Sequence, residues 1–346
     1  MPTLLETVII IIVMNVSALR IVAAAALLAA PFGLASCSTG AGQPSASSSA
    51  APAGDCPAAP VDVVVSVDQW GDIVSQLGGS CTKVTTLLAS SSVDPHDYEP
   101  SPADAATFSG AQLVVVNGAH YDEWATKLAA GSAPDAPVID AAETGGETGE
   151  HDGHQHEEGE SPDDGHDHGE VNPHVWYDPA TVTAVADAVT TELSKLAPEA
   201  ADYFAQRRGE FTGAMRPYTA EIAAIKAGAS GKTYATTESV FDYMATSIGL
   251  QNKTPTGYQA AASNETDPSP ADLDAFLKLL GAKGVDVLIY NTQTEGSVPE
   301  QIRSAAESAG IPVVNVTETV APGAKSFEAW QVDQLTALAK ALGVGA

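Results

Sequence analysis

The sequence predicts an α/β fold with two small parallel-sheet lobes joined by one long helix. Strand-like apolar runs alternate with helical patterns over residues 61–140, which is the order expected of a parallel sheet covered by helices. The same alternation resumes over residues 233–342. Between these regions, residues 198–226 have a helical pattern with no strand inside it, so this stretch is the predicted connection.

The first lobe is predicted from strand-like runs at 61–67, 84–88, 113–117 and 138–140, separated by helical patterns at 68–77, 101–109 and 122–130. The run at 61–67 is continuously apolar and β-branched, which suits a strand buried on both faces of a sheet. Ser101 is a favourable N-cap for the second helix, and Pro102 suits its first position. A further helix is expected at 181–196.

The connection and the second lobe follow from the same patterns. A helix of ~28 residues spans ~42 Å, which is enough to cross between two lobes. Gly209, Gly213 and Pro217 are expected to bend it. The second lobe is predicted from strands at 233–236, 285–290 and 313–316 and from helices at 240–248, 272–281, 299–309 and 327–342.

The length and charge of the chain limit its partners. The 346 residues are enough for two domains with cores of their own. The formal net charge of −29 repels nucleic acid and other polyanions, which excludes them as partners. The same field attracts cations. An acid-rich, soluble secreted protein would have a similar composition, so the charge alone does not decide for a cation-binding function.

The N-terminal region has the pattern of a secretory signal. Residues 21–30 form a short apolar core that Arg20 precedes, and small residues follow it. The sequence Leu-Ala-Ser-Cys that ends at Cys37 resembles the lipobox of bacterial lipoproteins, whose cysteine is diacylated and becomes the mature N-terminus.

The first 13 residues do not resemble the start of a signal sequence. Residues 1–13 contain Glu6 and no basic residue, which is unusual for a signal sequence, so Met14 is a candidate start. An uncleaved transmembrane helix from about residue 4 to 34 is the alternative, because ~20 apolar residues suffice to span a bilayer.

The other two cysteines, Cys56 and Cys81, form an even pair once Cys37 carries a lipid. Outside the cytoplasm thiols tend to pair, and each of the two lies just before a predicted strand. A disulfide that ties neighbouring strand starts is therefore expected. Their spacing does not suit a metal site.

These segments define the domains. The boundaries are 1–36 for the signal peptide, 37–59 for the lipidated cysteine and a flexible tether, 60–196 for the first lobe, which includes an acidic His-rich loop at 143–170, 197–228 for the linking helix and 229–346 for the second lobe.

Four possible metal ligands lie beyond the ends of predicted strands. His96 follows the second strand, His174 follows the loop after the fourth, and Glu238 and Glu318 come directly after strands of the second lobe. Because ligands bind beyond the carboxyl ends of parallel strands, these residues are expected to converge on the cleft between the lobes. Two imidazoles and two carboxylates suit Zn²⁺ or Mn²⁺. The alternatives are a hydrogen bond from His96 to Asp97 and helix capping by the carboxylates.

The motifs around these residues read Asp-Pro-His96-Asp-Tyr-Glu-Pro-Ser, Asn-Pro-His174-Val-Trp, Thr-Thr-Glu238-Ser-Val-Phe-Asp-Tyr and Val-Thr-Glu318-Thr-Val. They resemble the zinc- and manganese-binding solute-binding proteins of bacterial ABC importers, over essentially all of residues 60–346. The resemblance implies these four residues as metal ligands between two lobes joined by one long rigid helix. Zinc binders of this family often carry His at the third position, and the usual final ligand is Asp, so Glu238 and Glu318 depart from that pattern.

Residues outside this set are expected to assist it. Asp94, Tyr98, His120 and Glu265 are candidates for orienting the imidazoles, with a purely structural role as the alternative for each. The loop at 143–170 has little to bury and is expected to be disordered. Its histidines are expected to bind Zn²⁺ weakly as an accessory metal loop; they are His151, His154, His156, His166 and His168.

The predicted function is therefore that of an extracytoplasmic, lipid-anchored metal-binding protein that serves an ABC permease and its ATPase as a monomer. Zinc is favoured by the His-rich loop, and manganese is the alternative because Glu238 stands where zinc binders often have His. A surface zinc buffer without a permease and a zinc hydrolase are the rival functions. The hydrolase is disfavoured because no HExxH motif occurs and four protein ligands leave no open position for a catalytic water.

Overall fold

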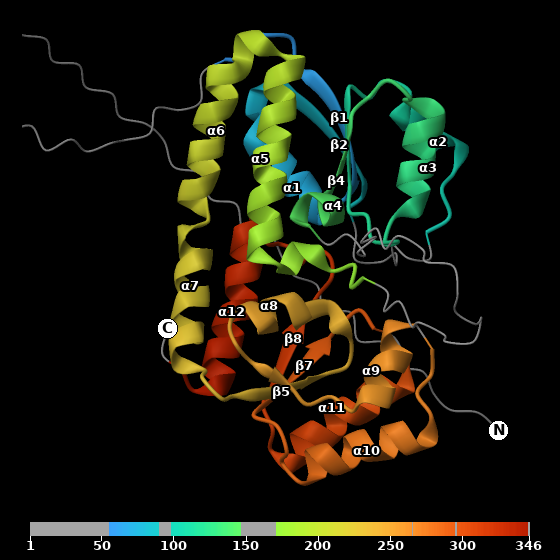
Figure 1. Cartoon of the computed structure of the whole chain (residues 1–346), viewed down its shortest axis with the longest axis vertical. Coiled ribbons are helices and arrows are strands. Elements are labelled where there is room, and N and C mark those ends of the chain that lie inside the picture. The colour runs from blue at the N-terminus through green and yellow to red at the C-terminus, as the bar shows by residue number, and fades with distance from the viewer. Residues whose placement is uncertain (1–54, 90–97, 147–170, 265, 295, 345–346) are drawn as a thin grey trace, which may run out of the picture. The chain divides into compact units, whose positions relative to one another are not determined.

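The protein, seen in a computed structural model, contains two four-stranded parallel sheets with helices around them (Figure 1). The structure describes residues 55–89, 98–146, 171–264, 266–294 and 296–344. The strand orders are β2-β1-β3-β4 and β6-β5-β7-β8, so the predicted α/β class with two parallel sheets is confirmed. Within the described residues, none of the helices is both long enough and apolar enough to span a bilayer.

The first sheet consists of β1 (Val61–Val67), β2 (Thr82–Leu88), β3 (Leu113–Val116) and β4 (Val138–Asp140). Its helices are α1 (Asp68–Gly78), α2 (Pro102–Phe108), α3 (Glu123–Ser132), α4 (Ala141–Gly145) and α5 (Pro179–Leu196), with 3₁₀ turns at Gly79–Cys81 and Val175–Tyr177. Nearly all of β1 is buried, as expected of a central strand in a parallel sheet. Ser101 and Asp104 form the capping box that begins α2.

The second sheet consists of β5 (Thr233–Thr236), β6 (Gln251–Asn252), β7 (Val287–Asn291) and β8 (Val313–Val316). Its helices are α8 (Asp242–Ser247), α9 (Thr256–Ser263), α10 (Pro270–Gly281), α11 (Ser297–Ala309) and α12 (Phe327–Leu342), with a 3₁₀ turn at Ser239–Phe241.

Three short elements were not predicted. The edge strand β6 has only two residues, too few for an alternating pattern, and α9 buries a single side chain, that of Tyr258. The short helix α4 occupies a region expected to be loop, where the Asp140 carboxylate caps it by accepting the backbone N–H of Glu143 at 3.0 Å.

The predicted linking helix is interrupted. A 3₁₀ turn (Pro198–Ala200) leads into α6 (Ala201–Ala214), and α7 (Arg216–Gly228) follows after Met215. Pro217 has no N–H to donate to the carbonyl of Gly213, which is where a proline is expected to break a helix. The two halves pack on different partners, α6 against α1 and α5 and α7 against α12 (Figure 1).

One continuous apolar core contains buried residues of both sheets, including Trp70, Trp176 and Trp330. A smaller cluster around Phe276 and Ile302 lies under α10 and α11. At the amino ends of β1 and β2, a disulfide joins Cys56 to Cys81 with a Cα–Cα distance of 5.0 Å. The bridge therefore lies at the end of the sheet opposite to the carboxyl edge.

Removal of this disulfide should lower stability without affecting a site at the carboxyl edge. The bridge closes a loop of 25 residues. In a Cys56→Ser/Cys81→Ser variant we expect the free energy of unfolding in urea to fall by about 3 kcal/mol, because the unfolded chain regains loop entropy. Metal affinity should stay unchanged. An unaltered unfolding midpoint would contradict this role of the bridge.

Candidate metal centre

Three of the four predicted metal ligands lie in the described part of the chain, and buried contacts link them. Glu238 follows β5 and Glu318 follows β8, so both lie at the carboxyl edge of the second sheet. His174 precedes the 3₁₀ turn before α5, and its Nε2 atom lies 3.8 Å from Oε2 of Glu318. Only 3% of His174 and 8% of Glu318 are exposed. The two lobes therefore bring an imidazole and a carboxylate together out of solvent.

The ring of His174 is oriented by Asn172. The Oδ1 atom of Asn172 accepts the backbone N–H of His174 at 3.1 Å and lies 2.7 Å from Nδ1 of the ring. The Nδ2 atom of Asn172 donates to the Ser239 carbonyl at 2.9 Å, which fixes the amide with Oδ1 towards the imidazole. A neutral ring then carries its proton on Nδ1, so Nε2 has the lone pair that a metal ligand needs.

Glu318 is held from both lobes. Its backbone N–H donates to Gln293 Oε1 at 2.7 Å, and its carbonyl accepts from Gln69 Nε2 at 2.6 Å. The carboxylate accepts from Asn291 Nδ2 at 2.8 Å through Oε1 and from the Tyr121 hydroxyl at 3.2 Å through Oε2. Gln69 and Tyr121 belong to the first lobe, so the position of Glu318 depends on how the lobes meet.

Glu238 lies against the same asparagine. Its Oε2 atom accepts from Asn291 Nδ2 at 2.7 Å and from the Thr294 hydroxyl. Burial raises the pKa of Glu238, and the negative charge of Glu318 raises it further. The positive charge of a bound cation would stabilise the ionised Glu238 in this buried position and reduce its repulsion from Glu318. These are the electrostatics expected of a cation site.

An unusual loop brings Tyr121 to Glu318. Gly118, Ala119 and His120 all have positive φ, at 78°, 50° and 62°. A side chain at Gly118 would also collide with the Asp140 carboxylate, because a Cβ there would lie 2.0 Å from Oδ1. The buried Asp122 carboxylate holds the loop by accepting the N–H groups of Asn117 at 2.7 Å and Gly118 at 2.9 Å. Left-handed conformation is costly for residues other than glycine, so these contacts must hold it in place.

The first turns of α1 also contact the loop that carries Glu318. Asp68 Oδ1 accepts the backbone N–H of Val320 at 3.3 Å, and Asp72 Oδ2 accepts that of Phe327 at 2.7 Å. Burial raises the pKa of Asp68 from 3.8 to about 6, and it also raises the pKa of Asp72. These two carboxylates are therefore part of the contact between the lobes.

His174, Glu238 and Glu318 do not form a complete coordination site in this structure. Among the residues that the structure describes, no three His, Cys, Asp or Glu side chains are arranged so that they could hold one ion. The Asn291 amide lies between the two carboxylates, and a complete site would need Glu238 to approach the pair formed by His174 and Glu318. The fourth predicted ligand, His96, lies outside the described residues, so its role remains a prediction.

Of the four residues predicted to orient the imidazoles, His120 and Tyr98 lie in the described part of the chain. His120 is exposed, and its Nδ1 atom lies 2.6 Å from Oε1 of Glu123. The Tyr98 hydroxyl donates to Asp104 at 2.8 Å. The remaining predicted site residues fall outside the described part of the chain; they are Cys37, Asp94, Glu265, His151, His154, His156, His166 and His168.

The residues that orient the ligands were not predicted from the sequence. Asn291 had a detectable signal, because it is polar and ends a buried strand. Asn172 also had one, two positions before His174. Gln69 and Tyr121 had none, because they lie 249 and 197 positions from the glutamate that they contact.

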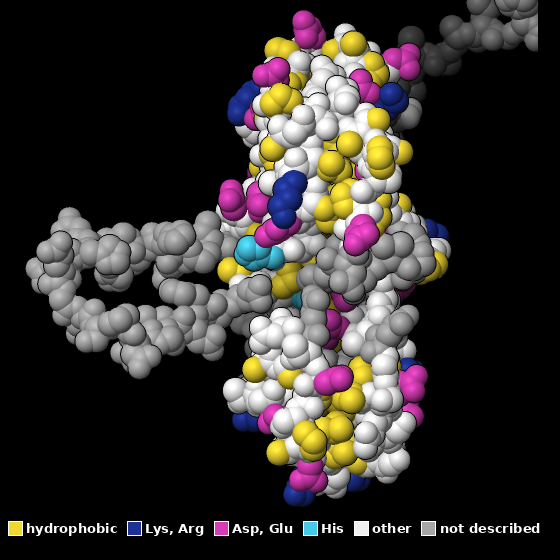
Figure 2. Space-filling model, turned by 90° about the vertical axis from the view of Figure 1, so that its right-hand side faces the viewer, with side chains coloured by type: hydrophobic (Ala, Val, Ile, Leu, Met, Phe, Trp, Pro, Cys, Tyr) yellow, Lys and Arg dark blue, Asp and Glu magenta, His cyan; other side chains and the backbone are white. Residues whose placement is uncertain are grey.

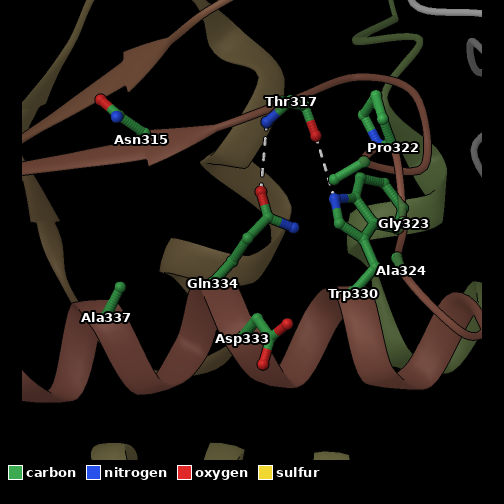
Figure 3. A pocket seen from close by; sticks show the side chains of 10 residues that line it. Asn315, Thr317, Pro322, Gly323, Ala324, Trp330, Asp333, Gln334 and Ala337 are labelled. Atoms are coloured by element: carbon green, nitrogen blue, oxygen red, sulfur yellow. Dashed lines mark hydrogen bonds between the residues drawn. The ribbon is translucent and has the colours of Figure 1, made fainter. Parts of the chain in front are cut away.

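A separate cavity of about 380 Å³ lies between β8 and α12 (Figure 3). Of the described residues that line it, Asp333 alone is ionisable. At its wall, the Thr317 N–H donates to Gln334 Oε1 at 3.1 Å, and Trp330 Nε1 donates to the Thr317 hydroxyl at 2.9 Å. These contacts fix the residue before Glu318. Neither His174, Glu238 nor Glu318 is among the described residues that line this cavity.

Comparisons with known proteins agree with a metal-binding centre. A family described as zinc-uptake complex component A, periplasmic, matches residues 63–341. The high-affinity zinc uptake system protein ZnuA of Bacillus subtilis is 26% identical over 218 residues, which cover 63% of this chain and 67% of that protein. The zinc-binding protein AdcA of Streptococcus pyogenes serotype M6 is 23% identical over 277 residues, covering 74% of this chain. The chain spans only half the length of this AdcA protein.

Solved structures show the same fold. The periplasmic zinc binding protein TroA from Treponema pallidum has a TM-score of 0.65 at 17% identity, with 82% of this chain and 99% of that chain covered. The solute-binding protein FpvC from Pseudomonas aeruginosa, in complex with Mn²⁺, has a TM-score of 0.64 at 21% identity, with 82% and 98% covered. At these identities the likeness concerns the fold alone.

Neutralising Asp68 should change how stability depends on pH. Its pKa in the folded protein is about 6, above the ordinary 3.8, so the folded state binds more protons between these values. Its contribution to stability is therefore present below about pH 4 and lost as the pH rises through 6. In metal-free protein, Asp68→Asn should become more stable relative to the parent by up to about 3 kcal/mol between pH 4 and pH 7.

Urea unfolding at pH 4, 5.5 and 7 measures this difference. Asp135→Asn is the matched control, because Asp135 is exposed on the surface of the same lobe. A constant difference between Asp68→Asn and the parent across this range would contradict the effect of burial on Asp68.

Proposed function

The chain belongs to the zinc-uptake complex component A family, and on this premise we propose that it captures a divalent metal ion outside the cell and delivers it to an ABC importer. Zinc is the proposed ion. The relatives from Bacillus and Streptococcus are named for zinc uptake or zinc binding, and none of these names describes an enzyme. Manganese is the competing ion, because a protein of the same fold is in complex with Mn²⁺.

The observation that carries this proposal is the buried pair formed by His174 and Glu318, with Glu238 beside it. An imidazole nitrogen and carboxylate oxygens at a shared edge form a donor set that suits Zn²⁺ and tolerates harder ions. Each carboxylate has its orientation set by hydrogen bonds, which is how metal sites hold their ligands. Together with His96, these residues would supply four ligands.

The surface charge would bring cations to the protein without selecting among them. The net charge is −29, and acidic side chains are spread over the face that Figure 2 shows, among basic and apolar ones. A field of this kind raises the local concentration of every cation. Selection of one ion is therefore assigned to the buried site.

Capture would occur by equilibrium coordination. A metal-bound imidazole must be unprotonated, so affinity should fall as the pH drops through the imidazole range. The proposed partners are the permease and ATPase of an importer, with this protein acting as a monomer. A lipid on Cys37 would hold it at the outer face of the membrane, and residues 38–55 would act as a tether.

Loss of His174 should abolish tight binding. In a titration against a competing chromophoric chelator, His174→Ala should reduce the Zn²⁺ affinity by more than about 100-fold, because it removes a direct ligand. Lys127→Ala is the control, since Lys127 is exposed on α3 and pairs with Glu123, and it should bind like the parent. The competing chelator separates tight binding from weak binding by the histidines of residues 151–168.

A double variant tests the two proposed imidazole ligands, His96 and His174, together. His96→Ala/His174→Ala should bind no more tightly than His174→Ala alone. If the double variant kept the affinity of the parent protein, the proposed site would be wrong.

A further inference from the structure

We propose that Asn291 is a positioning residue that sets the metal preference of this site. It would do so by occupying one oxygen of each glutamate, so that each glutamate can offer only its other oxygen to the ion. The inference rests on the proposed function, since it assumes that Glu238 and Glu318 are the ligands.

The geometry of Asn291 supports this role. Only 1% of the residue is exposed, and its Nδ2 atom donates to Glu238 Oε2 at 2.7 Å and to Glu318 Oε1 at 2.8 Å. An amide nitrogen has two hydrogens, so both are used. The other end is fixed, because Oδ1 accepts the backbone N–H of Gln293 at 3.1 Å. The amide therefore cannot rotate without losing these contacts.

The strand order explains why one side chain reaches both carboxylates. Within the second sheet, β7 lies between β5 and β8. Glu238 follows β5, Glu318 follows β8, and Asn291 is the last residue of β7. Its backbone N–H also donates to the Thr237 hydroxyl at 3.2 Å, which ties it to the residue before Glu238.

The hydrogen bonds divide the oxygens of the two glutamates. Thr294 donates to the same Oε2 atom of Glu238 that Asn291 contacts, and no hydrogen bond reaches its Oε1 within the described part of the chain. In Glu318, Oε1 accepts the hydrogen bond from Asn291, whereas Oε2 is the atom that lies 3.8 Å from Nε2 of His174. The Tyr121 hydroxyl also donates to this Oε2, but at 3.2 Å this bond is longer than the 2.8 Å bond from Asn291 to Oε1, so Oε2 is the oxygen that an ion would engage more easily.

This division has a consequence for the choice of metal. Zn²⁺ is usually four-coordinate and tetrahedral, and a carboxylate that binds through one oxygen counts as one ligand. Harder ions such as Mn²⁺ prefer more oxygen ligands in an octahedral arrangement. Carboxylates that bind through both oxygens would supply them. By holding one oxygen of each glutamate, Asn291 would keep the coordination number low and favour Zn²⁺.

Two variants of Asn291 test this inference. Asn291→Ala frees Oε1 of Glu318 and leaves Oε2 of Glu238 with the Thr294 hydroxyl as its hydrogen-bond donor. Asn291→Asp has nearly the same size but replaces the donor with an acceptor. In both, the ratio of Zn²⁺ to Mn²⁺ affinity should fall by about 10-fold or more, the size typical of lost contacts around metal ligands. Asn315→Ala is the control, because Asn315 is an exposed asparagine on the neighbouring strand β8, and its ratio should stay unchanged.

The affinities of the whole protein for each metal are measured by competition with chelators, and the electron paramagnetic resonance spectrum of bound Mn²⁺ reports its ligand environment. A merely structural loss would weaken both metals in parallel and leave the ratio and the spectrum unchanged. Either that result or no change at all in both variants would overturn the inference.

The proposed function can fail separately. If His174→Ala retained tight Zn²⁺ binding, the proposed site itself would be wrong. If His174→Ala lost tight binding while Asn291→Ala and Asn291→Asp kept the affinity ratio of the parent, only the role of Asn291 would be wrong.

Discussion

Two carboxylates, those of the buried Glu318 and the half-buried Glu238, are brought together at the carboxyl edge of one sheet. Burial of like charges is unfavourable unless hydrogen bonds or a cation compensate for it. Here one neutral amide donates to both carboxylates, and an imidazole of the other lobe lies 3.8 Å from Glu318. The residues around this pair hold the two carboxylates and the imidazole in these positions.

The contacts between the lobes also hold the candidate ligands in position. Gln69 fixes the backbone of Glu318 from α1, and Tyr121 reaches its carboxylate from a strained loop at the end of β3. Asn172 orients His174 on one side and donates to the second lobe on the other. A change in how the lobes meet would therefore alter the ligand geometry directly. Metal binding and the relative position of the lobes are expected to be coupled for this reason.

Most of the fold could be predicted from the sequence, because parallel strands buried on both faces give continuous apolar runs. The strands at β1 and β8 and the closing helix α12 were predicted with their observed bounds. The elements that were missed, such as β6, are too short for a periodic signal. The interruption at Met215 had a signal in Pro217, but the sequence predicted a bend rather than two helices.

The family could also be predicted, since the motifs around His96, His174, Glu238 and Glu318 are local in the sequence, and the family match over residues 63–341 confirms it. The hydrogen bonds around the ligands could not be predicted, because they join residues far apart in the chain. Asn172, two positions before His174, and Asn291, at the end of a buried strand, are the exceptions, although the strand order that brings Asn291 to both glutamates was not visible in the sequence.

The most direct measurement is the position of the ion itself. Crystals of the protein loaded with one equivalent of Zn²⁺ would give an anomalous difference peak at the zinc edge. We expect one strong peak bonded to Nε2 of His174 and to one oxygen each of Glu238 and Glu318, at about 2.0–2.2 Å. A peak held by other residues, with Asn291 still bridging two metal-free glutamates, would contradict the proposed centre.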